Sequence, residues 1–409
     1  MKQIFLVLLA AAITLIGFVS AEPNVSSISG SVVNGDSVII SGSGFGVHLD
    51  YSPTEGYLPA AWTDFESGYV DYDVWARLGP GPELAVDQQR INSAVSARSG
   101  GDLRNFTNVF GEELINELPR SFYNPNAADS QILFMSGWFM FPNGTFHALT
   151  HNVAEQCKFI STLDVNNSAN QYWNIPGWQG DTEVDLKMNF EDGRGAADPV
   201  ELRMYGPTGN AVINENEWHR FDIAVDVTKG YGLKESRFYA DGKEYTTDSN
   251  RYFREDCDPC PRHFVGSFFI RYIRNAGWYQ YFDDAFVDNS WARVEICNES
   301  IWDESRRRHC EIQIPTAWSD DSITVTVNQG SFNDTGAAYL FVVDENGSAS
   351  EGYPITFSTG THKADLNDDG VISMAELISF IARWKANDNV TKADVEGARD
   401  IWFTGGIYT

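Results

Sequence analysis

An acidic stretch of twelve residues near the C-terminal end, DLNDDGVISMAE at 365–376, has the spacing of a calcium-binding loop. Loops of the helix-loop-helix kind use oxygens at positions one, three and five, a glycine at six, a backbone carbonyl at seven and a bidentate carboxylate at twelve. Position nine usually acts through water. The chain supplies these ligands in register: Asp365, Asn367, Asp369, Val371, Ser373 and Glu376. We therefore expect this loop to bind a calcium ion.

Two amphipathic segments follow the loop. LISFIARWKA continues directly from it, and NVTKADVEGARDIW comes next without an intact metal loop of its own. Both segments are apolar at helical spacing. Residues 363–409 therefore resemble a dockerin, a module of tandem EF-hand-type loops that attaches secreted proteins to a cohesin. The resemblance implies attachment to a cohesin-like or other surface partner, and the missing second loop predicts one calcium ion in this module.

The N-terminal residues 1–21 are typical of a secretory signal peptide. Lys2 precedes an apolar run over residues 4–19, and small residues stand before Glu22. The run is too short for a membrane span. No second long apolar stretch occurs, so we expect a secreted chain with no transmembrane segment after signal removal. Eight Asn-x-Ser/Thr sequons are compatible with a glycoprotein.

The charge balance excludes two classes of partner. Lys and Arg number 29 against 57 Asp and Glu, which gives a formal net charge of −28. Nucleic acids and anionic membranes both require clustered basic residues. We therefore expect neither as a partner.

The five cysteines should be oxidised outside the cell. Cys297 and Cys310 would close a short loop and are the favoured disulfide. Cys257 and Cys260 are close enough to pair, or one of them takes Cys157 instead. One thiol is left over in any scheme.

The middle of the chain is rich in alternating apolar residues, which favours β-structure. The segment EWHRFDIAVDV at 217–227 and the segment SRFYADGKEY at 236–245 predict two strands, the second ending in an Asp241-Gly242 hairpin turn. On this pair, residues 60–292 resemble the concanavalin A-like and laminin G jelly rolls. The resemblance implies a protein that binds or cuts carbohydrate. We expect a secreted or cell-surface protein that binds carbohydrate as a lectin does, without catalysis.

The segments that flank the jelly roll belong together. SSISGSVVNGDSVIISGSGFG, within residues 22–50, resembles the opening hairpin of an immunoglobulin-like TIG domain, and residues 293–360 resemble its remainder. This implies a jelly roll inserted into a TIG sandwich, since loops tolerate domain insertion. In the alternative, the hairpin completes a neighbouring molecule and copies self-assemble into a filament. The expected fold class is mostly β: a jelly-roll sandwich and an immunoglobulin-like sandwich, with a small helical calcium-loop tail.

Carbohydrate binding needs flat aromatic faces for sugar rings. NQYWNIPGWQGD and NAGWYQYF offer such residues, and the candidates are Trp173, Trp178, Trp278 and Tyr279. Core packing is the alternative for any single tryptophan, above all for Trp138, Trp218 and Trp291.

A second metal site is implied by the resemblance to jelly-roll carbohydrate-binding modules, many of which hold a structural calcium. DFESG at 64–68 and FDDAFVD at 282–288 occupy the corresponding strands, and Glu66 with Asp284 would be the ligands. Strand alternation places Asp284 and Phe286 on one face, opposite Asp283.

The enzyme alternative is a polysaccharide lyase acting on acidic glycans. Such a lyase needs a Tyr or His as base and acid, and cationic or amide groups that neutralise a uronate carboxylate. The candidates are Tyr279, Arg271, Arg274 and His151. However, the Arg-x-Glu-x-Arg and Gln-Ile-His patterns of alginate lyases are absent, so binding without catalysis is preferred.

Overall fold

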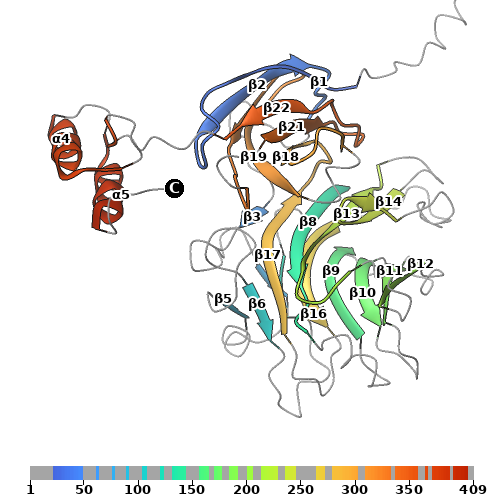
Figure 1. The fold of residues 1–409 in the computed structure, drawn as a ribbon. Helices are drawn as coiled ribbons and strands as arrows, with labels where there is room; N and C mark the ends of the chain where they lie inside the picture. Colours follow the sequence, from blue (N-terminus) through green and yellow to red (C-terminus); the bar gives the residue numbers. More distant parts are fainter. Residues whose placement is uncertain are drawn as a thin grey trace, which may run out of the picture.

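The computed structural model describes the residue ranges 22–48, 61–63, 76–78, 89–91, 104–107, 120–123, 131–143, 156–164, 170–176, 184–191, 200–205, 213–228, 235–245, 264–271, 279–302, 309–332, 337–357, 364–366, 371–386 and 390–403. For many strand residues it describes the backbone alone. The chain is mostly β, as the sequence predicts, and its described helices lie near the C-terminal end (Figure 1). No described helix has the length and apolar character needed to cross a membrane.

One sandwich, here called the terminal sandwich, combines the two ends of the β-region. Its strand order is β1-β2-β20-β19-β18-β21-β22. The bounds are β1 Asn24–Ser29, β2 Ser37–Ser43, β18 Arg293–Cys297, β19 Cys310–Trp318, β20 Ser322–Thr326, β21 Ala337–Val343 and β22 Tyr353–Thr356. Strand β2 pairs antiparallel with β20, with Ile40 opposite Ile323. The N-terminal hairpin therefore completes the sheet of its own chain.

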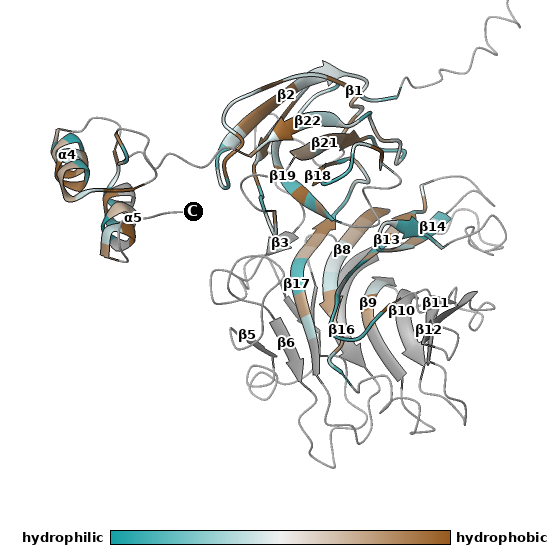
Figure 2. Cartoon of the chain, in the orientation of Figure 1, coloured by the Kyte–Doolittle hydropathy of each residue, from teal (hydrophilic) through white to brown (hydrophobic). Residues whose placement is uncertain are grey.

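Strand β19 connects the two layers of the terminal sandwich. Its first half pairs with β18, with Cys310 opposite Cys297. Its second half pairs with β20 from Ile314 onward, with a bulge between Pro315 and Ala317. The space between the layers holds a core contributed by both chain segments, in agreement with the hydropathy pattern of Figure 2. The core residues are Val38, Ile40, Phe45, Val294, Ile296, Trp318, Ile323, Val325, Leu340 and Val342.

The predicted disulfide between Cys297 and Cys310 is present in this sandwich. Both half-cystines are buried, and they pack against Phe341. The two residues are directly opposite each other in the β18–β19 ladder. Cys257 and Cys260 lie outside the described residues.

The jelly roll lies between the two halves of the terminal sandwich in sequence. One sheet, here called the β13 sheet, has the order β15-β14-β13-β8-β17-β6-β5, with β3 paired to β17. The bounds are β3 Ala61–Thr63, β5 Gln89–Ile91, β6 Arg104–Thr107, β8 Ile132–Met140, β13 Trp218–Asp226, β14 Glu235–Ala240, β15 Lys243–Glu244 and β17 Tyr279–Asp288. Asp241 and Gly242 form the predicted turn between β14 and β15, both with positive φ.

The second sheet, here called the β9 sheet, has the order β12-β11-β10-β9-β16-β7-β4. The bounds are β4 Ala76–Leu78, β7 Arg120–Tyr123, β9 Gln156–Asp164, β10 Asn170–Pro176, β11 Val184–Glu191, β12 Val200–Tyr205 and β16 Phe264–Arg271. Aromatic rings fill the space between the two sheets. Phe159 of β9 packs edge-on against Phe139 and Phe221 of the β13 sheet, at centroid distances of 4.9 and 4.8 Å.

The alternation predicted for β17 is wrong. Asp283 is opposite Trp138 and Phe286 is opposite Ser136, so an extra residue bulges between them. Asp283 and Phe286 therefore share a face. Asp284, which alternation assigned to the face of Phe286, lies in the bulge with a φ of 49°. The local sequence FDDAFVD contains no residue that would predict this bulge.

The two sandwiches share a hydrophobic cluster. Phe134 of β8, Ala224 of β13 and Phe286 of β17 pack with Trp291 and with Ile312 of β19. The indole Nε1 of Trp291 donates hydrogen bonds to the carbonyl oxygens of two jelly-roll strands, in β8 and β13. The terminal sandwich is therefore packed onto the outer face of the β13 sheet rather than tethered by the chain alone.

The C-terminal helices form a small module with its own core. Helix α4 (Met374–Lys385) begins at a capping box, in which Ser373 and Glu376 exchange hydrogen bonds with each other's backbone. Helix α5 (Lys392–Phe403) packs against it. The core is formed by Ala364, Ile372, Leu377, Phe380, Val390 and Ala398.

Candidate functional site

In the described part of the predicted calcium loop, the last carboxylate is buried. Glu376, at position twelve, is 7% exposed, and Asp365, at position one, is 4% exposed. One carboxylate oxygen of Glu376 accepts the backbone N–H of Leu366 at 2.9 Å, and the other accepts that of Ser373 at 2.9 Å. The Glu376 carboxylate therefore contacts the backbone at both ends of the loop.

This arrangement fits a calcium ion. A carboxylate at each end of the loop is buried, which is unfavourable unless it is paired with positive charge or with hydrogen-bond donors. The position of Ile372 also agrees with a calcium loop. This residue stands at position eight, between ligand positions seven and nine, and its side chain is buried in the module core. Asn367 and Asp369 lie outside the described residues. Asp365, Val371, Ser373 and Glu376 would hold the ion from the described part of the loop, and bound calcium would tie the loop to α4.

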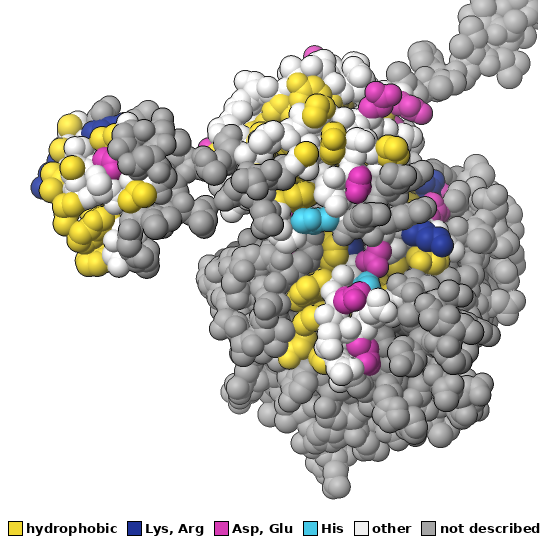
Figure 3. Space-filling view, in the orientation of Figure 1, with side chains coloured by type: hydrophobic (Ala, Val, Ile, Leu, Met, Phe, Trp, Pro, Cys, Tyr) yellow, Lys and Arg dark blue, Asp and Glu magenta, His cyan; other side chains and the backbone are white. Residues whose placement is uncertain are grey.

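Exposed apolar side chains gather on the same module (Figure 3). Among the described residues, Met374 and Ile378 are 48% and 59% exposed and lie one turn apart on α4. The other exposed large apolar side chains of the module are Leu366, Trp384 and Phe403. Exposed apolar side chains that gather on one small module are typical of a site that binds another protein.

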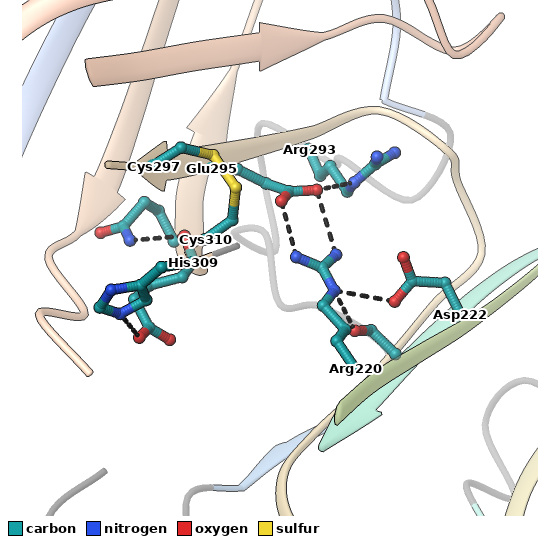
Figure 4. The surroundings of a disulfide bond; sticks show 10 residues. Arg220, Asp222, Arg293, Glu295, Cys297, His309 and Cys310 are labelled. Atoms are coloured by element: carbon teal, nitrogen blue, oxygen red, sulfur yellow. Dashed lines mark hydrogen bonds and ion pairs between the residues drawn. A yellow bond between two sulfur atoms is a disulfide. The ribbon is translucent and has the colours of Figure 1, made fainter. Parts of the chain in front are cut away.

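A buried ion cluster joins the two sandwiches (Figure 4). Arg220 of β13 is 3% exposed and donates two hydrogen bonds to Glu295 of β18, at 2.7 and 3.1 Å. It also donates to Asp222 at 2.8 Å. Arg293 donates to the same Glu295 at 2.6 Å. Two guanidinium groups and two carboxylates thus balance each other at the joint. The sequence carries no local signal for this cluster, because its partners are 75 residues apart.

The electrostatics of this cluster favour the charged forms. Burial lowers the pKa of Arg220, but the nearby charges of Asp222 and Glu295 and their hydrogen bonds raise it further than burial lowers it. The guanidinium therefore stays charged. Glu295 also lies near Cys297 and Cys310. That group is not a metal site, because the two sulfurs form a disulfide and both Glu295 oxygens accept from arginines.

A serine, a histidine and a glutamate meet beside the disulfide. The Oγ of Ser331 lies 2.6 Å from Nε2 of His309, and both atoms contact the same Oε1 of Glu311, at 3.0 and 2.9 Å. A catalytic triad requires the acid on the other ring nitrogen, so that the serine proton passes to the histidine. Here the hydroxyl donates to Glu311 instead. The group therefore anchors the turn before β21 to β19 and does not supply a nucleophile.

His219 anchors the beginning of β13. Its Nδ1 lies 2.8 Å from Asp241, the first residue of the β14–β15 turn, and its Nε2 is 3.1 Å from the Asn214 carbonyl. Burial lowers the pKa of His219, but the hydrogen bond and charge of Asp241, with Asn214 and Glu217, raise it above its ordinary value. The folded state thus favours the protonated imidazole.

We expect this histidine to make stability depend on pH. Because its folded pKa is raised, its contribution is complete below the unfolded pKa of about 6.5 and is lost as pH rises through the folded pKa. His219→Gln should reduce the loss of unfolding free energy as the pH rises above about 6.5, as measured by urea denaturation at each pH. Asp241→Asn should reduce it too. An unchanged pH profile in both variants would contradict this role.

The sequence-predicted binding and catalytic residues do not form one described cluster. Arg271 ends β16 in the β9 sheet, whereas Tyr279 begins β17 in the β13 sheet. The two lyase candidates therefore belong to different sheets. Trp173 lies in β10, opposite Met188 and Ile160. The remaining candidates lie outside the described residues: His151, Arg274, Trp178, Trp278 and, from the second metal site, Glu66.

Two of the tryptophans expected in the core are buried there, namely Trp138 and Trp291. The third, Trp218, is half-buried. Asp284, the other member of the second metal site, is buried in the β17 bulge, where its N–H donates to the Asp283 carboxylate at 3.0 Å.

No protein-family model matches the sequence, and no curated protein matches it. Solved structures match at low similarity. The receptor-binding domain of botulinum neurotoxin type G has 11% identity and a TM-score of 0.31 over 62% of this chain and 66% of that domain. The chain thus covers slightly less than two thirds of that domain.

Two alginate lyases match similarly. One, in complex with alginate tetrasaccharide, has 10% identity and a TM-score of 0.36 over 57% of this chain and 98% of that one. Another, from a Chlorella virus, has 13% identity and a TM-score of 0.31 over 50% of this chain and 94% of that one. Similarity at this level does not assign a function to this chain.

Proposed function

We propose that this protein is a secreted, calcium-binding protein that binds polysaccharide through its jelly roll without cleaving it. The main support for polysaccharide binding is that the two jelly-roll sheets differ in their contacts with the terminal sandwich. The terminal sandwich packs on the outer face of the β13 sheet. The described contacts of that joint come from the β13 sheet, so the β9 sheet would be the one to bind an extended chain.

The C-terminal module supplies the second half of the proposal. A calcium ion in the 365–376 loop would order the module outside the cell, where calcium is plentiful. The exposed apolar side chains of α4 would then contact a surface or cohesin-like partner. The separation of Arg271 and Tyr279 on two sheets favours binding over lyase chemistry.

The test is to incubate the secreted protein, with calcium, against neutral and acidic polysaccharides. Retention on the polysaccharide and the ultraviolet absorbance of an unsaturated β-elimination product would be read in the same wells. We expect retention without absorbance. Absorbance would establish a lyase instead, and the absence of both signals with any polysaccharide would refute the proposed binding.

A further inference from the structure

One layer of the terminal sandwich has an outer face without charged side chains. Strands β1, β2 and β20 turn Ile28, Ile40 and Ile323 toward the core, and these three residues are in register. Alternate residues of the same strands therefore point outward. We call the following set the neutral face: Ser27 and Ser29 of β1, Ser37, Ile39, Ser41 and Ser43 of β2, and Ser322, Thr324 and Thr326 of β20. Apart from Ile39, its members are serines and threonines.

The neutral face is open to solvent. Ile39 is 45% exposed, and the serines beside it, Ser29 and Ser37, are exposed as well. Strands β1 and β2 lie on the side of the terminal sandwich away from the jelly roll (Figure 1). The joint with the jelly roll therefore leaves this face uncovered.

The neutral face is also even in height. Directly opposite residues of neighbouring strands share a face. The row through its centre consists of Ser29, Ile39, Thr324 and Ala317, from β1, β2, β20 and β19. Neighbouring strands are about 4.8 Å apart, so this row spans roughly 14 Å. Small side chains surround one larger apolar residue, which leaves a surface on which another sheet can pack closely.

The absence of charge on this face is unusual for the chain. Charged residues make up 21% of the sequence, with 57 acidic against 29 basic ones. The acids near this face stand beyond the ends of its strands. Asp36 directly precedes β2 and Asp321 directly precedes β20, and both are exposed. Because β2 and β20 are antiparallel, these two acids lie at opposite ends of the neutral face.

This distribution of charge bears on contacts between copies of the chain. A formal net charge of −28 makes two copies repel each other. A contact through the neutral face brings no like charges into direct opposition. The neutral face is therefore a surface on which this acidic chain can accept a second copy of itself.

The neighbouring edge of the sheet is less suitable for a partner. Strand β1 follows Pro23 and has a bulge between Val25 and Ser27. Prolines and bulges commonly prevent another strand from pairing with an edge. A second copy would therefore pack on the face rather than extend the sheet.

We propose that the neutral face packs against the neutral face of a second copy, forming a dimer with two-fold symmetry. The contact is self-complementary, because the same patch is used on both sides. Ile39 supplies the apolar centre that each copy buries against its partner. An interface of a few short strands belongs to the small and weak class, so the dimer forms as the protein concentration rises. The dimer would carry two jelly rolls and two C-terminal modules, which strengthens attachment to a repetitive surface by avidity.

Sedimentation velocity of the full-length protein over a range of concentrations tests this dimer. The wild type should shift from monomer toward dimer as its concentration rises. Added salt should strengthen the dimer, because it screens the repulsion between two acidic copies. Ile39→Asp should raise the dissociation constant by about tenfold or more, since each copy would bury an unpaired charge. Thr324→Glu, in register with Ile39, should have the same effect.

Matched variants separate a lost contact from misfolding. Ile301 is 57% exposed in the connection between β18 and β19, outside the neutral face, so Ile301→Asp should dimerise like the wild type. Ile39→Val keeps an uncharged, β-branched side chain and should retain the dimer. Because Ile39 is exposed in one copy, Ile39→Asp should unfold near the temperature of the wild-type monomer.

Ile378→Asp tests the other exposed apolar surface, on α4. A dimer lost in Ile378→Asp but kept in Ile39→Asp would place self-association in the C-terminal module and overturn the inference. A monomer at every concentration up to about 0.5 mM, near the weak end of specific affinities, would overturn it as well. So would a dimer that added salt dissociates. None of these outcomes depends on polysaccharide or calcium binding, so the proposed function is tested separately.

Discussion

Replacing Glu295 with alanine should destabilise the protein by about 3–5 kcal/mol, the loss measured when one partner of a buried ion pair is removed. Glu295 is fully buried and accepts hydrogen bonds from Arg220 and Arg293. Without it, two guanidinium groups remain in the joint with Asp222 as the described carboxylate beside Arg220. Urea denaturation of both proteins would measure the change in unfolding free energy.

Two further variants make this result specific. Glu351→Ala, an exposed carboxylate on the terminal sandwich, should change stability by less than about 0.5 kcal/mol. Arg220→Met in the Glu295→Ala background should recover part of the lost unfolding free energy, because it removes a buried guanidinium that no longer has Glu295 as a partner. A loss below about 1 kcal/mol in Glu295→Ala, or additive effects in the double variant, would show that the cluster does not couple the two sandwiches.

The joint also has a consequence for cooperativity. The hydrophobic cluster of Phe134, Phe286 and Ile312 and the ion cluster both span the two sandwiches. In the wild type, the jelly roll and the terminal sandwich should therefore lose structure together. The N-terminal hairpin takes part in the same unit, because β2 pairs with β20 and His48 lies 3.2 Å from Asp288 at the end of β17.

The sequence predicted features whose determinants are local. The turn at Asp241-Gly242 follows from two residues that accept positive φ, and the Cys297–Cys310 disulfide follows from a short separation in a chain expected outside the cell. The strand positions of β13 and β14 follow from alternation. The N-terminal hairpin was assigned to the distant strands 293–360 by resemblance, and the strand pairing places it in the same sheet.

Features that depend on pairing between distant strands were not predictable. The β17 bulge moved Asp284 off the face that alternation assigned, because the bulge is fixed by the partner strand β8 rather than by local sequence. The Arg220–Glu295 contact requires two sandwiches to dock.

Glu376→Gln should abolish calcium binding at the 365–376 loop. The amide keeps the shape of the side chain and can still accept the Ser373 N–H, so the capping box of α4 is retained. It cannot, however, supply the negative bidentate carboxylate of position twelve. We expect calcium affinity to fall by more than the roughly 10–100-fold seen when supporting partners of a metal site are removed. Calcium titration by calorimetry on the full-length chain would measure this loss.

Stability measurements separate this loss from misfolding. At calcium about 100 times its dissociation constant, a ligand that binds only the folded state adds about 2.7 kcal/mol, and Glu376→Gln should forfeit that gain. In a chelator the variant should be destabilised only by the loss of the acceptor for the Leu366 N–H, about 1 kcal/mol. Glu396→Gln, on α5 and paired only loosely with Lys392 at 3.4 Å, is the control and should respond to calcium like the wild type. An undiminished calcium response in Glu376→Gln would show that this loop is an acidic turn held by its own hydrogen bonds, and any calcium would then bind elsewhere, with Asp284 in the β17 bulge as the next residue to substitute.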